Sequence, residues 1–206
     1  LMSMRGVYAE LSRLSGRRIG LLGGAFNPAH DGHLHISEAA LAQLQLDEVW
    51  WLVSPQNPLK ASKGMASLPA RLAEAKTVAR RPDIHVTNIE ARLGTQYTID
   101  TLSALQRYCP RTRFVWLMGA DNLVQMPKWR AWTAIFKAVP VAVFARSTYS
   151  LRALTGKVAH RYGRCRVQER GFSQLARRKT PAWAFLHIKL HPASATKIRK
   201  TRQKQR

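Results

Sequence analysis

The stretch Arg18-Ile-Gly-Leu-Leu-Gly-Gly-Ala-Phe-Asn-Pro-Ala-His-Asp-Gly-His33 decides the expected fold. Its first part, residues 19–22, is an apolar run with the length of a buried strand. Gly23 and Gly24 end this run, at a place where the backbone must turn tightly or lie close to another group. The stretch therefore predicts a strand that runs into a loop.

The residues after this loop predict a helix that begins near two histidines. Leu34, Leu41 and Leu44 recur at helical spacing, and His30 and His33 stand near the start of that pattern. Free backbone N–H groups and the positive end of the helix dipole make this position favourable for phosphate. Imidazoles there can donate hydrogen bonds to phosphate oxygens. The alternative is that one histidine caps the helix and the other is simply exposed.

The composition indicates one folded, cytoplasmic domain. The chain has 206 residues, 46% of them hydrophobic, which is enough for a substantial core. No apolar run has membrane-spanning length, and Cys109 and Cys165 are far apart, without a metal-ligand cluster. We expect a single domain over residues 1–206, with an N-terminal extension at 1–17, a basic tail at 200–206, no membrane contact and no metal site of its own.

The formal charge of +23 points to anionic partners, either the phosphates of a small nucleotide or a nucleic acid backbone. Half of the 34 lysines and arginines lie from Arg146 onward, where Glu169 is the only acid. A compact active site does not need so many cations. We interpret some of the surplus as a solvated basic face, and nucleic acid is not the expected partner.

Strand and helix patterns alternate along the chain, which predicts an α/β fold with a doubly wound, mostly parallel sheet. Ligands of such sheets bind at the carboxyl ends of the strands. Residues 146–180 show no clear period. Further strands are expected at 48–54, 84–86, 113–118, 139–145 and 183–190, and further helices at 8–14, 68–81 and 97–108.

Taken whole, the pattern Gly-Gly-x-Phe-x-Pro-x-His-x-Gly-His resembles the signature of the nucleotidyltransferase superfamily that carries an HxGH motif. The chain most resembles the nicotinate mononucleotide adenylyltransferases, over about residues 18–199. This resemblance implies a Rossmann-like nucleotidyltransferase fold. It also implies adenylyl transfer from ATP to nicotinate mononucleotide in NAD biosynthesis, with pyrophosphate as the second product.

The C-terminal segment Ala193-Ser-Ala-Thr-Lys-Ile-Arg199 supplies a second anion-binding pattern. Ser194 and Thr196 would stand where a helix begins, with Arg199 one turn further on, so that hydroxyls, N–H groups and a guanidinium face one anion. The segment resembles the family's Ile-Ser-x-Thr-x-Ile-Arg signature, which binds ATP phosphates. Ala193 replaces the isoleucine of that signature.

Three other segments match the same family. Pro55-Gln-Asn-Pro-Leu-Lys60 ends at the position of a phosphate-facing lysine, and Tyr97-Thr-Ile-Asp-Thr-Leu102 carries the threonine that contacts the mononucleotide. Gly119-Ala-Asp-Asn-Leu123, followed by Trp129, corresponds to the stretch with an aspartate near the nucleotides and a tryptophan that stacks on the pyridine ring.

The resemblance implies the following site residues. Catalytic roles fall to His30, His33 and Arg199. ATP would be bound by these three together with Gly23, Gly24, Ala25, Phe26, Gly119, Asp121, Ser194 and Thr196. The mononucleotide would be bound by Asn27, Lys60, Thr98 and Trp129. The expected cofactor is Mg²⁺, carried by ATP.

Several alternatives stay open at this point. The acceptor could instead be nicotinamide mononucleotide or phosphopantetheine. Class I aminoacyl-tRNA synthetases share the histidine motif, but 206 residues leave little space for tRNA recognition. A basic module that binds nucleic acid without catalysis is the alternative from another class. Homo-oligomer formation is left open.

Overall fold

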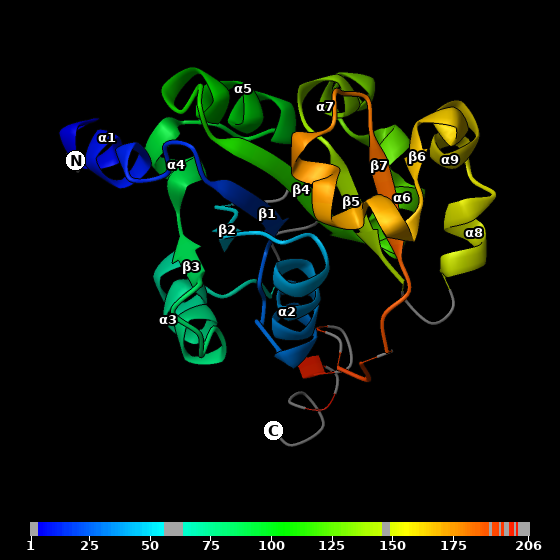
Figure 1. Ribbon diagram of the computed structural model, residues 1–206. Helices are drawn as coiled ribbons and strands as arrows, with labels where there is room; N and C mark the ends of the chain where they lie inside the picture. Colours follow the sequence, from blue (N-terminus) through cyan, green and yellow to red (C-terminus); the bar gives the residue numbers. More distant parts are fainter. Residues whose placement is uncertain are drawn as a thin grey trace.

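A computed structural model describes residues 4–55, 64–145, 149–189, 191–193, 195, 198–199 and 201. Its centre is a seven-stranded sheet in the order β3-β2-β1-β4-β5-β7-β6 (Figure 1). Every strand pair in this sheet is parallel, which confirms the predicted α/β class. The strands are β1 (Arg18–Gly24), β2 (Glu48–Val53), β3 (Ile84–Thr87), β4 (Arg113–Gly119), β5 (Val141–Phe144), β6 (Arg166–Val167) and β7 (Trp183–Leu186).

Helices cover both faces of the sheet (Figure 1). The α-helices are α1 (Met4–Ser12), α2 (Asp31–Gln43), α3 (Leu68–Val78), α4 (Ile89–Leu93), α5 (Thr98–Tyr108), α6 (Ala120–Gln125), α7 (Trp132–Ala138), α8 (Ser150–Leu154) and α9 (Lys157–Arg161). The 3₁₀ helices are η1 (Met126–Lys128), η2 (Gly163–Cys165) and η3 (Glu169–Arg177).

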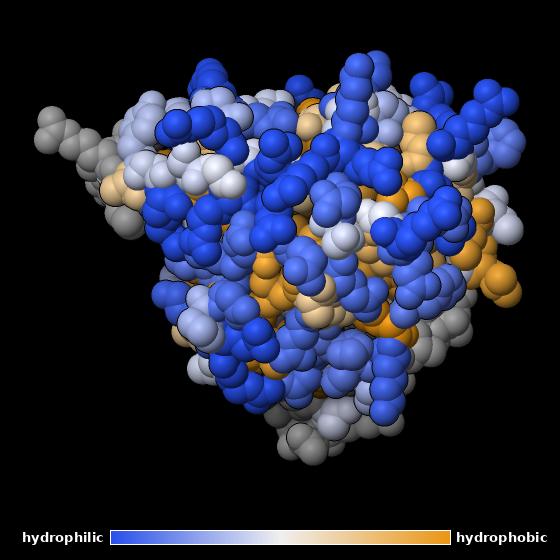
Figure 2. All heavy atoms as spheres, viewed as in Figure 1, coloured by the Kyte–Doolittle hydropathy of each residue, from blue (hydrophilic) through white to orange (hydrophobic). Residues whose placement is uncertain are grey.

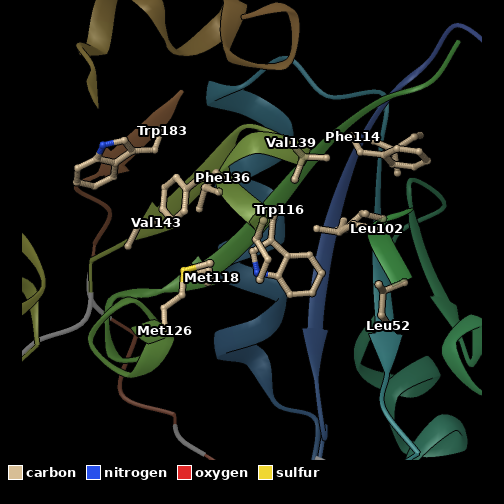
Figure 3. Close-up of a cluster of buried hydrophobic side chains, with 14 of the residues drawn as sticks. Leu52, Leu102, Phe114, Trp116, Met118, Met126, Phe136, Val139, Val143 and Trp183 are labelled. Atoms are coloured by element: carbon tan, nitrogen blue, oxygen red, sulfur yellow. The ribbon is translucent and has the colours of Figure 1, made fainter. Parts of the chain in front are cut away.

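Alternate residues of each central strand enter two separate apolar cores, as the period of two in a strand requires. In β4, Phe114, Trp116 and Met118 face the layer of α1, α5 and α7, whereas Val115 and Leu117 face the layer of α2, α3 and η3. Figure 3 shows Trp116 among the side chains of the first core. Both faces of the strand are buried, so its sequence reads as a continuous apolar run rather than as an alternating one.

The N-terminal helix α1 is part of the first core. Its Val7 and Leu11 are almost completely buried. The carboxylate of Glu10 accepts hydrogen bonds from His85 and Thr87 of β3 and from Arg92 of α4. Burial alone would raise the pKa of Glu10, but the hydrogen bonds and charges of His85 and Arg92 lower it to about 2. The helix is therefore anchored to β3 and α4 by packing and by an ionised carboxylate.

The part of 146–180 that the structure describes explains why no period was visible there. It consists of α8, α9, η2, the two-residue strand β6 and η3. Elements of two to nine residues are too short to repeat a hydrophobic pattern several times. Residues 146–148 lie outside the described residues.

Hydrophilic side chains cover most of the face of α2 and η3 (Figure 2). Arg164 of η2 and Arg170 and Arg177 of η3 are exposed, and none of them forms an ion pair with another described residue. In the described parts of the chain, no helix is both long and apolar enough to cross a bilayer.

Candidate active site

A cavity opens at the carboxyl ends of β1, β2 and β4, beside the position where the strand order reverses. Ligand sites of doubly wound sheets lie at this edge, because the loops that leave neighbouring strands there diverge to opposite faces. The lining residues come from seven separate stretches of the chain: Gly23, Gly24, Ala25, Ser54, Glu90, Gln96, Tyr97, Thr98, Trp116, Asn122, Lys128, Trp129 and Arg130.

Gly23 is required by the close approach of the Trp116 indole. A Cβ atom at position 23 would lie 2.5 Å from Cη2 of Trp116, which is closer than packed atoms tolerate. Trp116 in turn meets Trp129 edge to face, with ring centroids 6.4 Å apart. The glycine thus lets two tryptophans form one wall of the cavity, and the predicted ligand-facing Trp129 is part of that wall.

The two histidines of the motif open helix α2 through reciprocal hydrogen bonds. His30 is the N-cap residue, and its Nδ1 accepts from the backbone N–H of Gly32 at 3.1 Å. Nδ1 of His33 accepts from the backbone N–H of His30 at 3.2 Å. A neutral imidazole whose Nδ1 accepts carries its proton on Nε2. Both rings therefore present Nε2–H as a hydrogen-bond donor, and a phosphate oxygen is an acceptor for such a donor.

Aromatic packing holds the ring of His33. Its centroid lies 4.7 Å from that of Phe26 and 3.9 Å from that of His30. Phe26 is stacked on Trp51 of β2 at 5.2 Å and is buried, with a positive φ of 47°. Such a φ is unfavourable for a phenylalanine and persists only where the surroundings enforce it. In this structure Phe26 contributes packing around His33.

The C-terminal segment reaches the same helix end. Nη1 of Arg199 donates to the carbonyl oxygen of Asn27, although 172 residues separate the two along the chain. A Cβ atom on Gly32 would lie 3.2 Å from the carbonyl oxygen of Ala193, so the glycine lets this segment pass close to α2. The structure therefore brings Arg199 beside the loop that leads to His30 and His33, as the sequence predicts. In Figure 1 the C-terminal residues drawn in red lie near one end of α2.

The predicted site residues are distributed as follows. Gly23, Gly24, Ala25, Thr98 and Trp129 line the cavity. Asn27, His30 and His33 follow the lining residue Ala25 along the chain and lead into α2, and Arg199 contacts Asn27 there. Gly119 is the N-cap of α6, and Asp121 lies in its first turn. Lys60, Ser194 and Thr196 lie outside the described residues.

Asn27 contacts the segment that precedes α3. Its Nδ2 donates to the carbonyl oxygen of Gly64, and its Oδ1 accepts from the N–H of Ala66. The side chain was predicted to bind the mononucleotide. In this structure it joins the loop after β1 to the residues that lead into α3.

Sequence reasoning missed several lining residues. Lys128 and Arg130 are exposed and add positive charge at the cavity. The guanidinium of Arg130 lies 4.8 Å from the ring centroid of Tyr97, a cation–π distance. Glu90 belongs to α4, a five-residue helix that no periodicity signalled. The one feature of the sequence that could have drawn attention to Glu90 is its acidic side chain, because the chain holds only 11 acidic residues.

Glu90 is the carboxyl group among the described lining residues, and it is buried. Burial raises its pKa to about 7, and hydrogen bonds from Thr101 and Ser54 oppose the shift in part. Oγ1 of Thr101 donates to Glu90 at 3.3 Å. A carboxyl that keeps its proton at near-neutral pH repels incoming phosphate less than an ionised one does.

Replacement of Glu90 by glutamine is expected to stabilise the fold at pH 8 by about 3 kcal/mol and to change little at pH 4.5. In the unfolded chain the carboxyl loses its proton near pH 4.5, but in the folded protein it does so only near pH 7. The folded state therefore loses stability as the pH rises from about 4.5 to 7, and Gln cannot ionise. Urea unfolding of both proteins at the two pH values measures the difference.

Glu169→Gln is the matched control, because Glu169 is exposed at the start of η3. It should leave the pH dependence of stability unchanged. Equal stability of Glu90→Gln and the unsubstituted protein at pH 8 would show that burial does not raise the pKa of Glu90.

Within the described ranges, no three histidine, cysteine, aspartate or glutamate side chains gather as a metal-binding group. The cavity offers cations, aromatic faces and N–H donors around one buried carboxyl. Such a set can bind phosphate esters and a flat ring.

Comparisons with known proteins agree with this geometry. The family model described as cytidylyltransferase-like matches residues 21–201. A relative from Cereibacter sphaeroides, named as a probable nicotinate-nucleotide adenylyltransferase, is 52% identical over 183 residues, which are 89% of this chain and 97% of the relative. A relative with the same name from Parvibaculum lavamentivorans is 51% identical over 89% of this chain and 92% of its own length.

Solved structures show the same fold at low sequence identity. The Plasmodium falciparum nicotinic acid mononucleotide adenylyltransferase complexed with NaAD superposes with a TM-score of 0.66 at 16% identity, over 89% of this chain and 83% of that one. The same enzyme complexed with APC gives a TM-score of 0.64 at 15% identity, with the same coverage of both chains.

Proposed function

The chain belongs to the cytidylyltransferase-like family and, within it, to the nicotinate-nucleotide adenylyltransferases, and on this basis we propose that it transfers the adenylyl group of ATP to nicotinate mononucleotide. A phosphate oxygen of the mononucleotide attacks the α-phosphorus of ATP. The bond from that phosphorus to the bridging oxygen breaks, and pyrophosphate leaves with the bond electrons. The dinucleotide formed is nicotinate adenine dinucleotide, a precursor of NAD.

This chemistry needs alignment and charge neutralisation rather than a covalent intermediate. Two unit negative charges about 4 Å apart repel by ~4 kcal/mol at an effective dielectric constant of about 20. His30 and His33 donate through Nε2 to phosphate oxygens of ATP, with His33 nearest the reacting phosphorus. Arg199 stabilises the departing pyrophosphate.

The acceptor, nicotinate mononucleotide, binds in the cavity. Trp129 offers a flat face to the pyridine ring, and Thr98, the first residue of α5, contacts the mononucleotide. The remaining predicted contacts, Gly119 and Asp121 toward ATP and Lys60 toward phosphate, belong to the same proposal. Mg²⁺ carried by ATP would add to this neutralisation of charge.

One observation supports this proposal most strongly. The guanidinium of Arg199 and the paired histidines meet at the start of α2, next to the cavity that contains Trp129 and Thr98. A triphosphate site beside an aromatic pocket suits transfer between ATP and a pyridine nucleotide. Binding of nucleic acid as the main function requires neither of these features. The cytoplasmic location stays a prediction.

The purified protein is expected to release pyrophosphate from ATP and Mg²⁺ with nicotinate mononucleotide and to release less with the amide mononucleotide or phosphopantetheine. Supplying each acceptor in turn and quantifying pyrophosphate measures this preference. Release that is largest with phosphopantetheine would contradict the proposed acceptor. No release with any acceptor, together with salt-sensitive RNA binding, would favour the nucleic-acid alternative.

A further inference from the structure

Arg71 of α3 is a buried arginine that joins the carboxyl ends of two strands. Its side chain is among the largest fully buried ones, and the residue is only 1% exposed. The three nitrogens of the guanidinium group donate to four backbone carbonyl oxygens. Nη1 donates to Ala25 and Ser54 at 2.7 Å each, Nη2 to Pro55 at 3.0 Å and Nε to Ala66 at 2.9 Å.

Two of these carbonyls belong to residues that line the cavity. Ala25 follows β1 and Ser54 follows β2, and both residues line the cavity. A further bond, from the N–H of Ser54 to the carbonyl of Gly24 at 2.9 Å, closes the same wall. The planar guanidinium therefore sets the spacing between the two loops from directly behind the surface that a substrate would touch.

The charge of Arg71 has no carboxylate partner in the described structure, since all four acceptors are neutral carbonyls. Burial lowers the pKa of Arg71, yet a guanidinium stays protonated in proteins. A buried charge without a counter-charge is unfavourable, and an anion bound nearby offsets that cost. The dipoles of the four carbonyl groups offset only part of the cost of burying this charge.

We propose that Arg71 is a positioning residue for adenylyl transfer, which holds the Ala25 and Ser54 walls at the correct spacing and places a buried positive charge behind the phosphates. This inference rests on the proposed function. A purely structural arginine would satisfy the same four carbonyls and would affect folding alone. The two interpretations differ in what they predict for the kinetics of folded variants.

The test uses Arg71→Lys and Arg71→Met in the full chain, with kcat and KM for both substrates measured below the unfolding temperature of each variant. Lysine keeps the charge but cannot donate to four carbonyls in one plane, and methionine loses both properties. We expect kcat/KM for the mononucleotide to fall about tenfold with lysine and about a hundredfold with methionine, because small misplacements of reacting groups cost that much. KM for ATP should rise with methionine more than with lysine.

Arg18→Lys and Arg18→Met are the matched controls. Arg18 pairs with Asp47 at the amino end of β1, at the edge of the sheet opposite the cavity. These variants should lose stability and keep their kinetic constants. If Arg71→Met does not fold, the kinetic constants of Arg71→Lys alone test the positioning role of Arg71.

The proposal is overturned if folded Arg71→Lys keeps kcat/KM within about twofold of the unsubstituted enzyme, as the Arg18 variants should. It is also overturned if lysine is as damaging as methionine, because the charge would then contribute nothing. A lack of activity in the unsubstituted enzyme would count against the proposed function instead, so the two failures are distinguishable.

Discussion

Replacement of His33 by alanine is expected to lower kcat for pyrophosphate release by about 10²–10³-fold, the usual cost of removing one donor that stabilises developing charge. His33 is poised for this role, because its Nδ1 accepts from the N–H of His30 and its Nε2 then carries the proton. The ring is held against Phe26, so little reorganisation is needed when a phosphate binds. Steady-state kinetics with saturating ATP and mononucleotide measure the loss.

The effect on folding should be much smaller. Removal of the imidazole takes away one of the two reciprocal hydrogen bonds that cap α2, which lowers the free energy of unfolding by about 1 kcal/mol. His160→Ala, an exposed histidine on α9, is the control for a histidine lost from a helix elsewhere. A kcat for His33→Ala that equals the kcat of this control would defeat the assignment of His33.

Replacement of Arg199 by alanine is expected to lower kcat/KM for ATP by about a hundredfold, because a charge-assisted, bidentate donor to the leaving pyrophosphate is lost. Arg199→Lys should recover part of the rate, since it keeps the charge without the planar fork. The hydrogen bond from Nη1 to the carbonyl of Asn27 is also lost, at a cost to stability of about 1 kcal/mol. Initial rates at varied ATP concentration provide the measurement.

Arg164→Ala is the control for Arg199→Ala. Arg164 is exposed in η2, and it forms no ion pair within the described parts of the chain. Loss of general positive charge would affect both variants alike. Arg199 is catalytic only if its variant is slow and the Arg164 variant is not.

Local patterns in the sequence were sufficient to predict most of the central strands and the longer helices. The strand, loop and helix at residues 18–43 were predicted from an apolar run, two glycines and helical spacing, and they are β1 and α2. The strands expected at 48–54 and 113–118 are β2 and β4. The helices expected at 68–81 and 97–108 are α3, which ends early at Val78, and α5. These patterns are local, because burial of a strand or of a helix face constrains residues two to four positions apart.

The family resemblance implied which residues would form the site, and the structure brings several of them together at the edge of the sheet where the loops after parallel strands meet. Thr98 and Trp129 line one cavity, and Arg199 contacts the loop of the histidine motif. From the residues themselves, Gly23 and Gly24 were predicted to mark a tight turn or a close approach of the backbone. Gly23 accommodates Trp116, and Gly32 accommodates His30 and Ala193.

Tertiary structure alone decided the roles of Glu10, Arg71 and Glu90. Each is a common charged residue on a helix, and its sequence neighbours are compatible with an exposed side chain. Burial of Arg71 follows from the order of β1 and β2, whose loops present carbonyls to it from positions 46 and 17 residues away. No local period encodes which strands become neighbours. Such contacts depend on how the whole chain packs, and they set both the electrostatics of the cavity and the spacing of its walls.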